Sequence, residues 1–312
     1  MEEFIKIVLQ SGRTALELAL YVLLPVLVIM MALMKLAEAK GLLALVAHII
    51  RPVLRIFGVP GAGVFAMLQL LLVSFAAPVA TLSIMEKDNT AKRRIAATLA
   101  MLCSMSQANA VFPLVAVGLN LGVIMATSVA GGLISAAMTY YIFARSIGED
   151  DPDTAGLDPS ADKARNTSTL SAMIGGGQEA LQVILGAIPM LILAIFVVNV
   201  LKATGAIAGL ETLLKPLFGL IGFPAVAVLP IATKYLAGGT AMMGVTLNLV
   251  KEGAITVQEL NRMAGFIINP CDIVGVAVLV SAGARCTSVV RPAIFGAAVG
   301  IVFRGVLHLL IF

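Results

Sequence analysis

Residues 42–60 read LLALVAHIIRPVLRIFGVP, and residues 206–224 read AIAGLETLLKPLFGLIGFP. At this offset of 164 positions both stretches carry a basic residue followed by proline, and six residues later a Gly-X-Pro turn. The same register also aligns Pro25 with Pro189 and Gly41 with Gly205. Proline and glycine restrict or relax the backbone, so their recurrence in one register predicts two halves that follow the same path.

The composition indicates a chain that is embedded in a lipid bilayer. Of its 312 residues 60% are hydrophobic and only 12% are charged, and the mean hydropathy is +1.04, whereas soluble domains carry about 25% charged residues. Several apolar stretches reach the roughly 20 residues that a spanning helix needs. The N-terminal sequence lacks a basic region and a small-residue cleavage site, so we expect the first helix to be retained. A basic stripe with aromatics and a phosphate-binding loop are both missing, which argues against nucleic-acid binding.

The repeat divides the chain into a first half (residues 1–146), a polar acidic linker (147–176) and a second half (177–312). The linker contains the run Glu149-Asp150-Asp151-Pro152-Asp153, which cannot bury apolar surface and is expected to be solvated.

Each half begins with similar elements. A long apolar helix is predicted at about residues 14–36, and the segment from Leu42 to Phe57 places His48, Arg51 and Arg55 on one polar stripe. Such a stripe is typical of a helix lying at the membrane surface. Its counterpart, residues 206–218, carries Glu211 and Lys215 on one face.

Two further elements in each half are interrupted. The apolar run from Pro60 to Ile84 is broken at Ser74–Pro78, and its counterpart is broken at Gly238-Gly239. Each is either a single spanning helix or a re-entrant hairpin of two short helices whose tip faces protein or a cavity. Breaks follow at residues 103–109 and 269–272, and apolar helices at about 119–145 and 289–312 close the halves.

These elements predict an all-α integral membrane protein of two inverted repeats. Each repeat has three transmembrane helices, an interfacial amphipathic helix and a re-entrant hairpin, and an odd number of crossings inverts the second copy. On that arrangement one side receives 13 of the 21 basic residues and the other receives 8; the loop Lys87–Arg94 alone holds four. The positive-inside rule then places the basic loops in the cytoplasm and both termini outside a cell (inner) membrane. If the hairpins span, the two copies are parallel instead.

The Arg51-Pro52 and Lys215-Pro216 pairs, the Gly58-Val59-Pro60 and Gly222-Phe223-Pro224 turns and the interrupted segments resemble the nucleoside-recognition (Gate) domain family. Concentrative nucleoside transporters, spore-maturation membrane proteins and the membrane part of ferrous-iron transporters share this domain. The resemblance implies a transport core of inverted repeats, with two re-entrant hairpins and two unwound helices around a central site, and the transporters of this family form trimers. The chain lacks the additional helices of full nucleoside transporters and any nucleotide-hydrolysing domain.

Polar groups inside the interrupted segments are the candidate solute ligands, because polar side chains are costly in lipid. We take Asp272 as the only acidic residue deep within an apolar segment; it either binds solute or is a structural carboxylate paired with Lys234 or capping a half helix. Asn269 and Pro270 precede it, and Ser104, Ser106, Gln107 and Asn109 occupy the matching element. The hairpins would contribute Lys234, Tyr235, Gly238, Gly239 and Thr240 in the second half, and Ser74, Pro78 and Thr81 in the first. His48 and His308 are assigned no role.

The favoured function is a secondary transporter that moves a small polar, nucleoside-like solute by alternating access. No cofactor is expected beyond a coupling ion, H⁺ or Na⁺, and the partners are the solute, the bilayer and a homo-oligomer. The first alternative is a divalent metal permease that uses Cys103 and Cys271, two of the three cysteines. The second is a non-transporting membrane scaffold. An enzyme is not expected, because the sequence shows no catalytic constellation.

Overall fold

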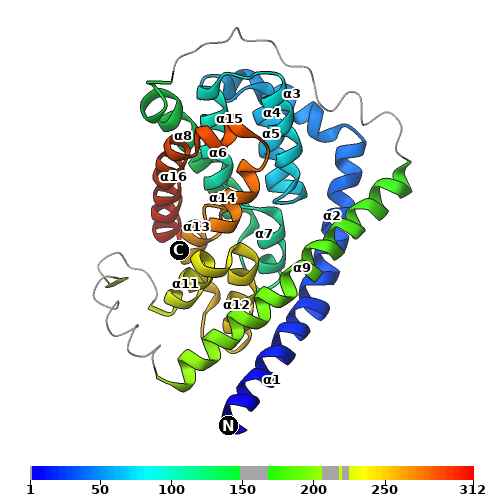
Figure 1. The fold of residues 1–312 in the computed structure, drawn as a ribbon, viewed down its shortest axis with the longest axis vertical. Coiled ribbons are helices and arrows are strands. Elements are labelled where there is room, and N and C mark those ends of the chain that lie inside the picture. Colours follow the sequence, from blue (N-terminus) through cyan, green and yellow to red (C-terminus); the bar gives the residue numbers. More distant parts are fainter. Residues whose placement is uncertain (1, 148–167, 206–217, 220–224) are drawn as a thin grey trace.

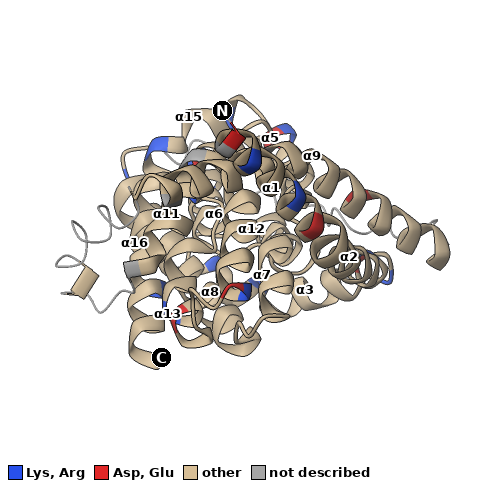
Figure 2. Cartoon of the chain, turned by 90° about the horizontal axis from the view of Figure 1, so that it is seen from below, with Lys and Arg blue, Asp and Glu red and all other residues tan. Residues whose placement is uncertain are grey.

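The computed structural model describes residues 2–147, 168–205, 218–219 and 225–312, and every regular element in these ranges is a helix (Figure 1). The expected surface helix of the second half, with Glu211 and Lys215, lies outside the described residues except for Phe218 and Gly219. Five helical segments of this part are long and apolar enough to cross a membrane: residues 4–39, 92–115, 121–143, 169–201 and 290–311. Charged residues are sparse along the ribbon (Figure 2). The chain is therefore a multi-pass membrane protein.

The first helix of each half is longer than predicted. In the first half, α1 (Glu2–Glu17), a π-helical turn (Leu18–Leu23) and α2 (Leu24–Ala39) follow one another without a break. In the second half, α9 runs from Thr169 to Ala203 and so begins inside the segment assigned to the linker. In Figure 1, α9 descends past α1 and α2, which ascend. The helix α9 packs against both α1 and α2, and Asn199 Nδ2 donates to Ser11 Oγ at 2.9 Å.

The amphipathic helix predicted from Leu42 to Phe57 is present as α3 (Leu42–Arg55). It begins after Gly41, whose φ of +74° lies in the left-handed region and turns the chain out of α2. His48 is exposed, as expected for a residue without a role.

The interrupted apolar runs are helix–break–helix units. In the first half, α4 (Gly61–Leu68) continues as a π-helical turn (Gln69–Val73) and stops at Ser74, whose backbone is extended, before α5 (Ala77–Lys87) begins. In the second half, a short 3₁₀ turn (Ala225–Ala227) leads into α11 (Val228–Ala237), and Gly238 with φ +85° separates it from α12 (Gly239–Lys251). Within each unit the two helices pack against one another. We call these units hairpin 1 and hairpin 2.

The second pair of breaks also lies where the sequence predicts it. Residues Met105–Gln107 separate α6 (Lys92–Ser104) from α7 (Ala108–Val115). In the second half, α13 (Val257–Ile267) and α14 (Ile273–Val280) are separated by residues 268–272.

The closing helices of the two halves pack against one another in antiparallel directions. They are α8 (Leu121–Met138), extended by a π-helical turn (Thr139–Phe143), and α16 (Val290–Ile311), which follows the short α15 (Ala284–Ser288). Their contacts run in opposite orders along the chain: Thr127 with His308, Gly131 with Arg304, Ser135 with Gly300 and Thr139 with Gly296. A Cβ on Gly300 would lie 1.9 Å from Ser135 Oγ and 2.4 Å from the Gly131 carbonyl oxygen, so glycine permits this close approach.

Two basic residues are wrongly counted among the eight that the sequence assigns to the less basic side. Arg304 and Lys234 are both fully buried, so neither is a loop charge. On the more basic side the grouping is consistent with the structure, because Arg285 Nη2 donates to Asn89 Oδ1 at 2.9 Å and Arg285 Nη1 to the Thr90 carbonyl at 3.1 Å. Arg285 therefore lies beside the basic loop at residues 87–94.

The close contact of α8 and α16 gives a test of the packing. We expect Gly300→Ala to lower the free energy of unfolding by about 1–3 kcal/mol, because the added methyl group overpacks a full interface. Gly175→Ala is the matched control, since a Cβ there meets nothing within 4 Å and alanine is a better helix former. Thermal unfolding in detergent measures both variants. Equal melting temperatures for the two would contradict the packing.

Candidate functional site

A cavity of about 190 Å³ lies where the four interrupted elements meet. Its lining comes from both hairpins, both helix breaks and α9: Phe75, Gln107, Val183, Gly186, Ala187, Ala237, Gly238, Gly239, Thr240, Ala241, Asp272, Val274 and Gly275. Residues that are up to 200 positions apart in the sequence therefore share one internal space. We call it the central cavity.

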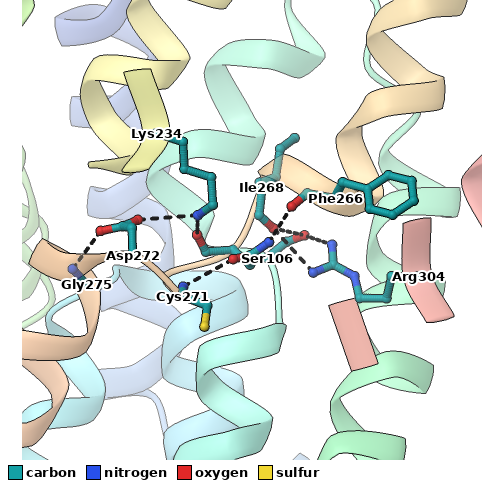
Figure 3. Close-up of polar contacts among 9 residues, drawn as sticks. Ser106, Lys234, Phe266, Ile268, Cys271, Asp272, Gly275 and Arg304 are labelled. Atoms are coloured by element: carbon teal, nitrogen blue, oxygen red, sulfur yellow. Dashed lines mark hydrogen bonds and ion pairs between the residues drawn. The ribbon is translucent and has the colours of Figure 1, made fainter. Parts of the chain in front are cut away.

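Asp272 and Lys234 form a buried ion pair at the edge of this cavity (Figure 3). Lys234 Nζ lies 3.3 Å from Asp272 Oδ2 and also donates to the Asn269 carbonyl at 2.5 Å. The other carboxylate oxygen of Asp272 accepts the Gly275 N–H at 2.8 Å and so caps α14. Both structural roles that the sequence left open for Asp272 are thus present, and the ion pair ties hairpin 2 to the break before α14.

Arg304 is a second buried cation, and the sequence interpretation missed it. Its guanidinium group reaches from α16 to the carbonyl oxygen of Ser104 at the end of α6 and, at 3.3 Å, to that of Ile268 at the end of α13. It also donates to the Ser106 hydroxyl, which itself donates to the Ile268 carbonyl at 3.1 Å (Figure 3). The C-terminal ends of two helices carry partial negative charge and free carbonyl groups. Arg304 therefore joins the two breaks through these carbonyls, and an arginine within an apolar helix is the signal that could have revealed it.

Several predicted solute ligands are occupied by bonds inside the breaks. The Asn269 side chain donates to the Phe266 carbonyl at 2.8 Å and accepts the Cys271 N–H at 3.1 Å. Ser104 Oγ bonds back to the Met101 carbonyl at 3.0 Å. Pro270 is buried, and its carbonyl oxygen would lie 2.1 Å from a Cβ on Gly275. These groups shape the breaks, and their contact with a solute stays a prediction.

Two predicted ligands of the first half stay candidates: Gln107, the last residue of the first break, and Asn109, in the first turn of α7. Gln107 lines the central cavity, where its Nε2 would lie 2.4 Å from a Cβ on Gly239. Asn109 is 3% exposed, and its Oδ1 has no hydrogen-bond partner among the described residues. A buried acceptor without a partner is costly unless water, an ion or a ligand reaches it.

Ser74 and Thr81 of hairpin 1 are not among the residues that line the central cavity, to which this hairpin contributes Phe75. Ser74 Oγ donates to Glu179 Oε1 at 2.7 Å, and Thr81 Oγ1 donates to Gln69 Oε1 at 2.7 Å. Gln69 in turn donates to Glu38, and Lys35 lies within 3.4 Å of Glu38 and Glu179. Hairpin 1 is thus tied to α2 and α9 by a second polar cluster. Because Glu179 lies in the apolar helix α9, the interpretation of Asp272 as the only such acidic residue is wrong.

Tyr235 lines a second space beside the Lys234–Asp272 pair. Its ring lies 5.6 Å from Lys234 Nζ and lines a larger, mostly apolar groove of about 810 Å³ between α11, α14 and α16. The groove and the central cavity share Asp272 as a lining residue.

The structure gives His308 a role that the sequence interpretation denied it. It is fully buried rather than solvated, its Nε2 lies 2.9 Å from Thr127 Oγ1, and its Nδ1 lies 2.6 Å from the Asn261 carbonyl oxygen. His308 therefore links α16 to α8 and α13.

We expect the bridge formed by Arg304 to make a measurable contribution to the free energy of unfolding. Arg304→Lys keeps the charge but cannot reach two carbonyls and a hydroxyl together, and hydrogen bonds to charged groups contribute about 1.5–3 kcal/mol each. We expect a loss of at least that size in unfolding free energy by thermal or denaturant unfolding. Arg291→Lys, an exposed position of the same helix, should leave stability unchanged. Equal stability of the two variants would show that Arg304 does not hold the breaks together.

Comparison of the sequence with known proteins finds one matching family model and a curated relative. Residues 20–125 match the sequence model of the family described as Gate, nucleoside recognition. Spore maturation protein B of Bacillus subtilis (strain 168) is 33% identical over 86 residues, which is 28% of this chain and 48% of that protein. The match thus spans about half the length of this curated relative.

Solved structures of CNTnw, a concentrative nucleoside transporter, share the fold. An inward-facing, substrate-bound state has a TM-score of 0.70 at 17% identity, over 93% of this chain and 74% of that one. An outward-facing state of a double variant has a TM-score of 0.69 at 17% identity, over 93% and 75%. Residues 20–125 therefore match the family that the sequence resembles, and over 93% of its length the chain shares the fold of the CNTnw structures.

Proposed function

We propose that the chain is a secondary transporter that moves a small polar solute, nucleoside-like in its chemistry, across the membrane by alternating access. One observation carries this proposal: the breaks of two hairpins and two discontinuous helices meet at one cavity that presents the side chains of Gln107, Thr240 and Asp272. An amide, a hydroxyl and a carboxylate can together donate to and accept from the hydroxyl and amide groups of such a solute. Interrupted helices around a midplane site are the recurring design of secondary transporters.

The antiparallel packing of α8 on α16 supports inverted repeats. These helices occupy equivalent places in the two halves, and their contacts pair Thr127 with His308 at one end and Thr139 with Gly296 at the other. Equivalent helices that pack in opposite directions are related by a twofold axis perpendicular to them, which lies in the membrane plane if both helices span. On this proposal the hairpins re-enter without crossing, and the basic loops face the cytoplasm with both termini outside.

Alternating access on this proposal moves the hairpins against the rest of the protein. The central cavity, at about 190 Å³, is smaller than the roughly 300–1,000 Å³ of typical ligand sites, so a solute needs one hairpin to withdraw. Hairpin 2 is held by the Lys234–Asp272 pair, and hairpin 1 by the bond from Ser74 to Glu179. We call these two contacts, which the opening of a hairpin would break, the latches. A coupling H⁺ or Na⁺ would act on the same carboxylates or at the unpartnered Asn109 oxygen.

The two alternatives receive less support. Among the described residues no group of three or more His, Cys, Asp or Glu side chains is placed to hold a metal ion. Cys103 is buried and Cys271 half-buried in one apolar cluster, which is the ordinary environment of a free cysteine. A membrane scaffold is suggested by the match to spore maturation protein B alone. A scaffold needs no shared polar cavity between two hairpins.

Thermal-shift measurements on the purified protein identify the solute class. Nucleosides, amino acids, sugars and divalent metals are tested separately, because a ligand that binds only the folded state raises the melting temperature. We expect a nucleoside to give the largest shift. A shift with divalent metals alone would favour the permease instead.

Transport by variants of the ion pair tests the mechanism. In proteoliposomes we expect Asp272→Asn to reduce nucleoside uptake at least about tenfold, since one hydrogen bond to a charged group contributes 1.5 kcal/mol or more. Asp88→Asn, at an exposed loop position, is the matched control.

Asp272→Asn also leaves Lys234 unpaired, so the double variant Lys234→Met/Asp272→Asn separates stability from transport. It contains no unpaired buried charge and should remain folded while losing uptake. Uptake at the wild-type rate by the folded double variant would refute a role for this pair in transport.

A further inference from the structure

The large groove beside the Lys234–Asp272 pair has the features of a second binding site. It encloses about 810 Å³, which is within the range of ligand sites, and such sites are mostly apolar with a few polar groups. Its walls are apolar side chains of α11, α13, α14 and α16, among them Ile231, Phe266, Val276 and Ile301, together with Phe218. The polar groups gather at its inner end, where Lys234, Tyr235, Cys271 and Asp272 lie.

The inner end of the groove carries no net charge. Lys234 and Asp272 neutralise one another at 3.3 Å, the lysine also donates to the Asn269 carbonyl, and the carboxylate also accepts the Gly275 N–H. An ionic ligand would have to give up its hydration without meeting a free counter-charge. A neutral hydrogen-bonding group loses much less hydration free energy on entering the groove. Tyr235, which is 49% exposed, offers such a group a hydroxyl partner.

The outer rim of the groove is apolar and faces outward. On α16, Val302 is 57% exposed and Ile294 38%, and this helix is long and apolar enough to cross the membrane. Large exposed apolar side chains on a spanning helix are in contact with lipid chains. The groove therefore runs from the lipid-facing surface inward to the ion pair.

We propose that this groove binds an uncharged amphiphile that enters sideways from the bilayer, with its apolar body between α14 and α16 and its hydrogen-bonding end at Tyr235 and Cys271. This binding site is separate from the central cavity, and binding there requires no transport. Because Asp272 lines both spaces, an amphiphile in the groove lies directly against the latch of hairpin 2.

Protection of Cys271 from alkylation tests the proposal on the full chain. Cys271 lines the groove and is half-buried, whereas Cys103 and Cys286 are buried, so mass spectrometry of the Cys271 peptide reports the groove alone. The protein is placed in lipid nanodiscs and treated with N-ethylmaleimide in the presence of hexadecanol, hexadecane or palmitate. We expect hexadecanol to slow the alkylation several-fold and the other two probes to have little effect, because the alkane lacks a polar end and palmitate is charged.

Three variants make the test specific. Tyr235→Phe should reduce the protection by hexadecanol to the level given by hexadecane. Val302→Trp, which fills the groove, should slow alkylation without any amphiphile and abolish further protection. Val306→Trp, on the same exposed face of α16 but outside the groove, should behave as the parent protein. Equal protection by hexadecanol and hexadecane, or equal behaviour of the two tryptophan variants, would overturn the proposal whatever the protein transports.

Discussion

The structure depends on one constraint: backbone groups freed by a helix break in an apolar interior must find partners. The chain meets this constraint with two buried cations. Arg304 takes the carbonyls of Ser104 and Ile268, and Lys234 takes the carbonyl of Asn269 while pairing with Asp272. Since an unsatisfied polar group inside the bilayer costs several kcal/mol, these side chains stabilise the breaks at residues 105–107 and 268–272. The same bonds hold hairpin 2 and both helix breaks around one cavity, whereas hairpin 1 is held by the bond from Ser74 to Glu179.

The two halves share a path but not their chemistry. At the offset of 164, Arg304 corresponds to Tyr140, Lys234 to Leu70 and Asp272 to Ala108, and Glu179 corresponds to Ala15. The prolines and glycines that shape the backbone recur, whereas these charged anchors occur only in the second half. A backbone pattern that recurs in the sequence thus carries different buried polar groups in the two halves. The first half supplies mainly carbonyl groups and the amide of Gln107.

The sequence predicts the backbone of this protein better than its side-chain contacts. The helix breaks at Ser74, Gly238–Gly239, Met105–Gln107 and residues 268–272 follow from local chemistry, since proline, glycine and clustered polar groups end helices wherever they fold. The pairing of Asp272 with Lys234 was foreseeable because both lie in apolar segments. The bridge by Arg304 was not, because its partners are carbonyls 36 and 200 positions away. The contact of the Ser74 side chain with Glu179 could not be predicted either, because the π-helical turn at Gln69–Val73 changes the helical periodicity just before Ser74.

On the transport proposal, the paired breaks line a compartment that water reaches from one side of the membrane at a time. The most direct test of this proposal is the labelling of Thr240→Cys, in a chain whose native cysteines are replaced by alanine, with a membrane-impermeant thiol reagent. The reagent is added to right-side-out and inside-out vesicles, with and without the solute. We expect labelling from both sides, with the solute shifting the ratio between them. Labelling from neither side, or by lipid-soluble reagents alone, would contradict the proposal.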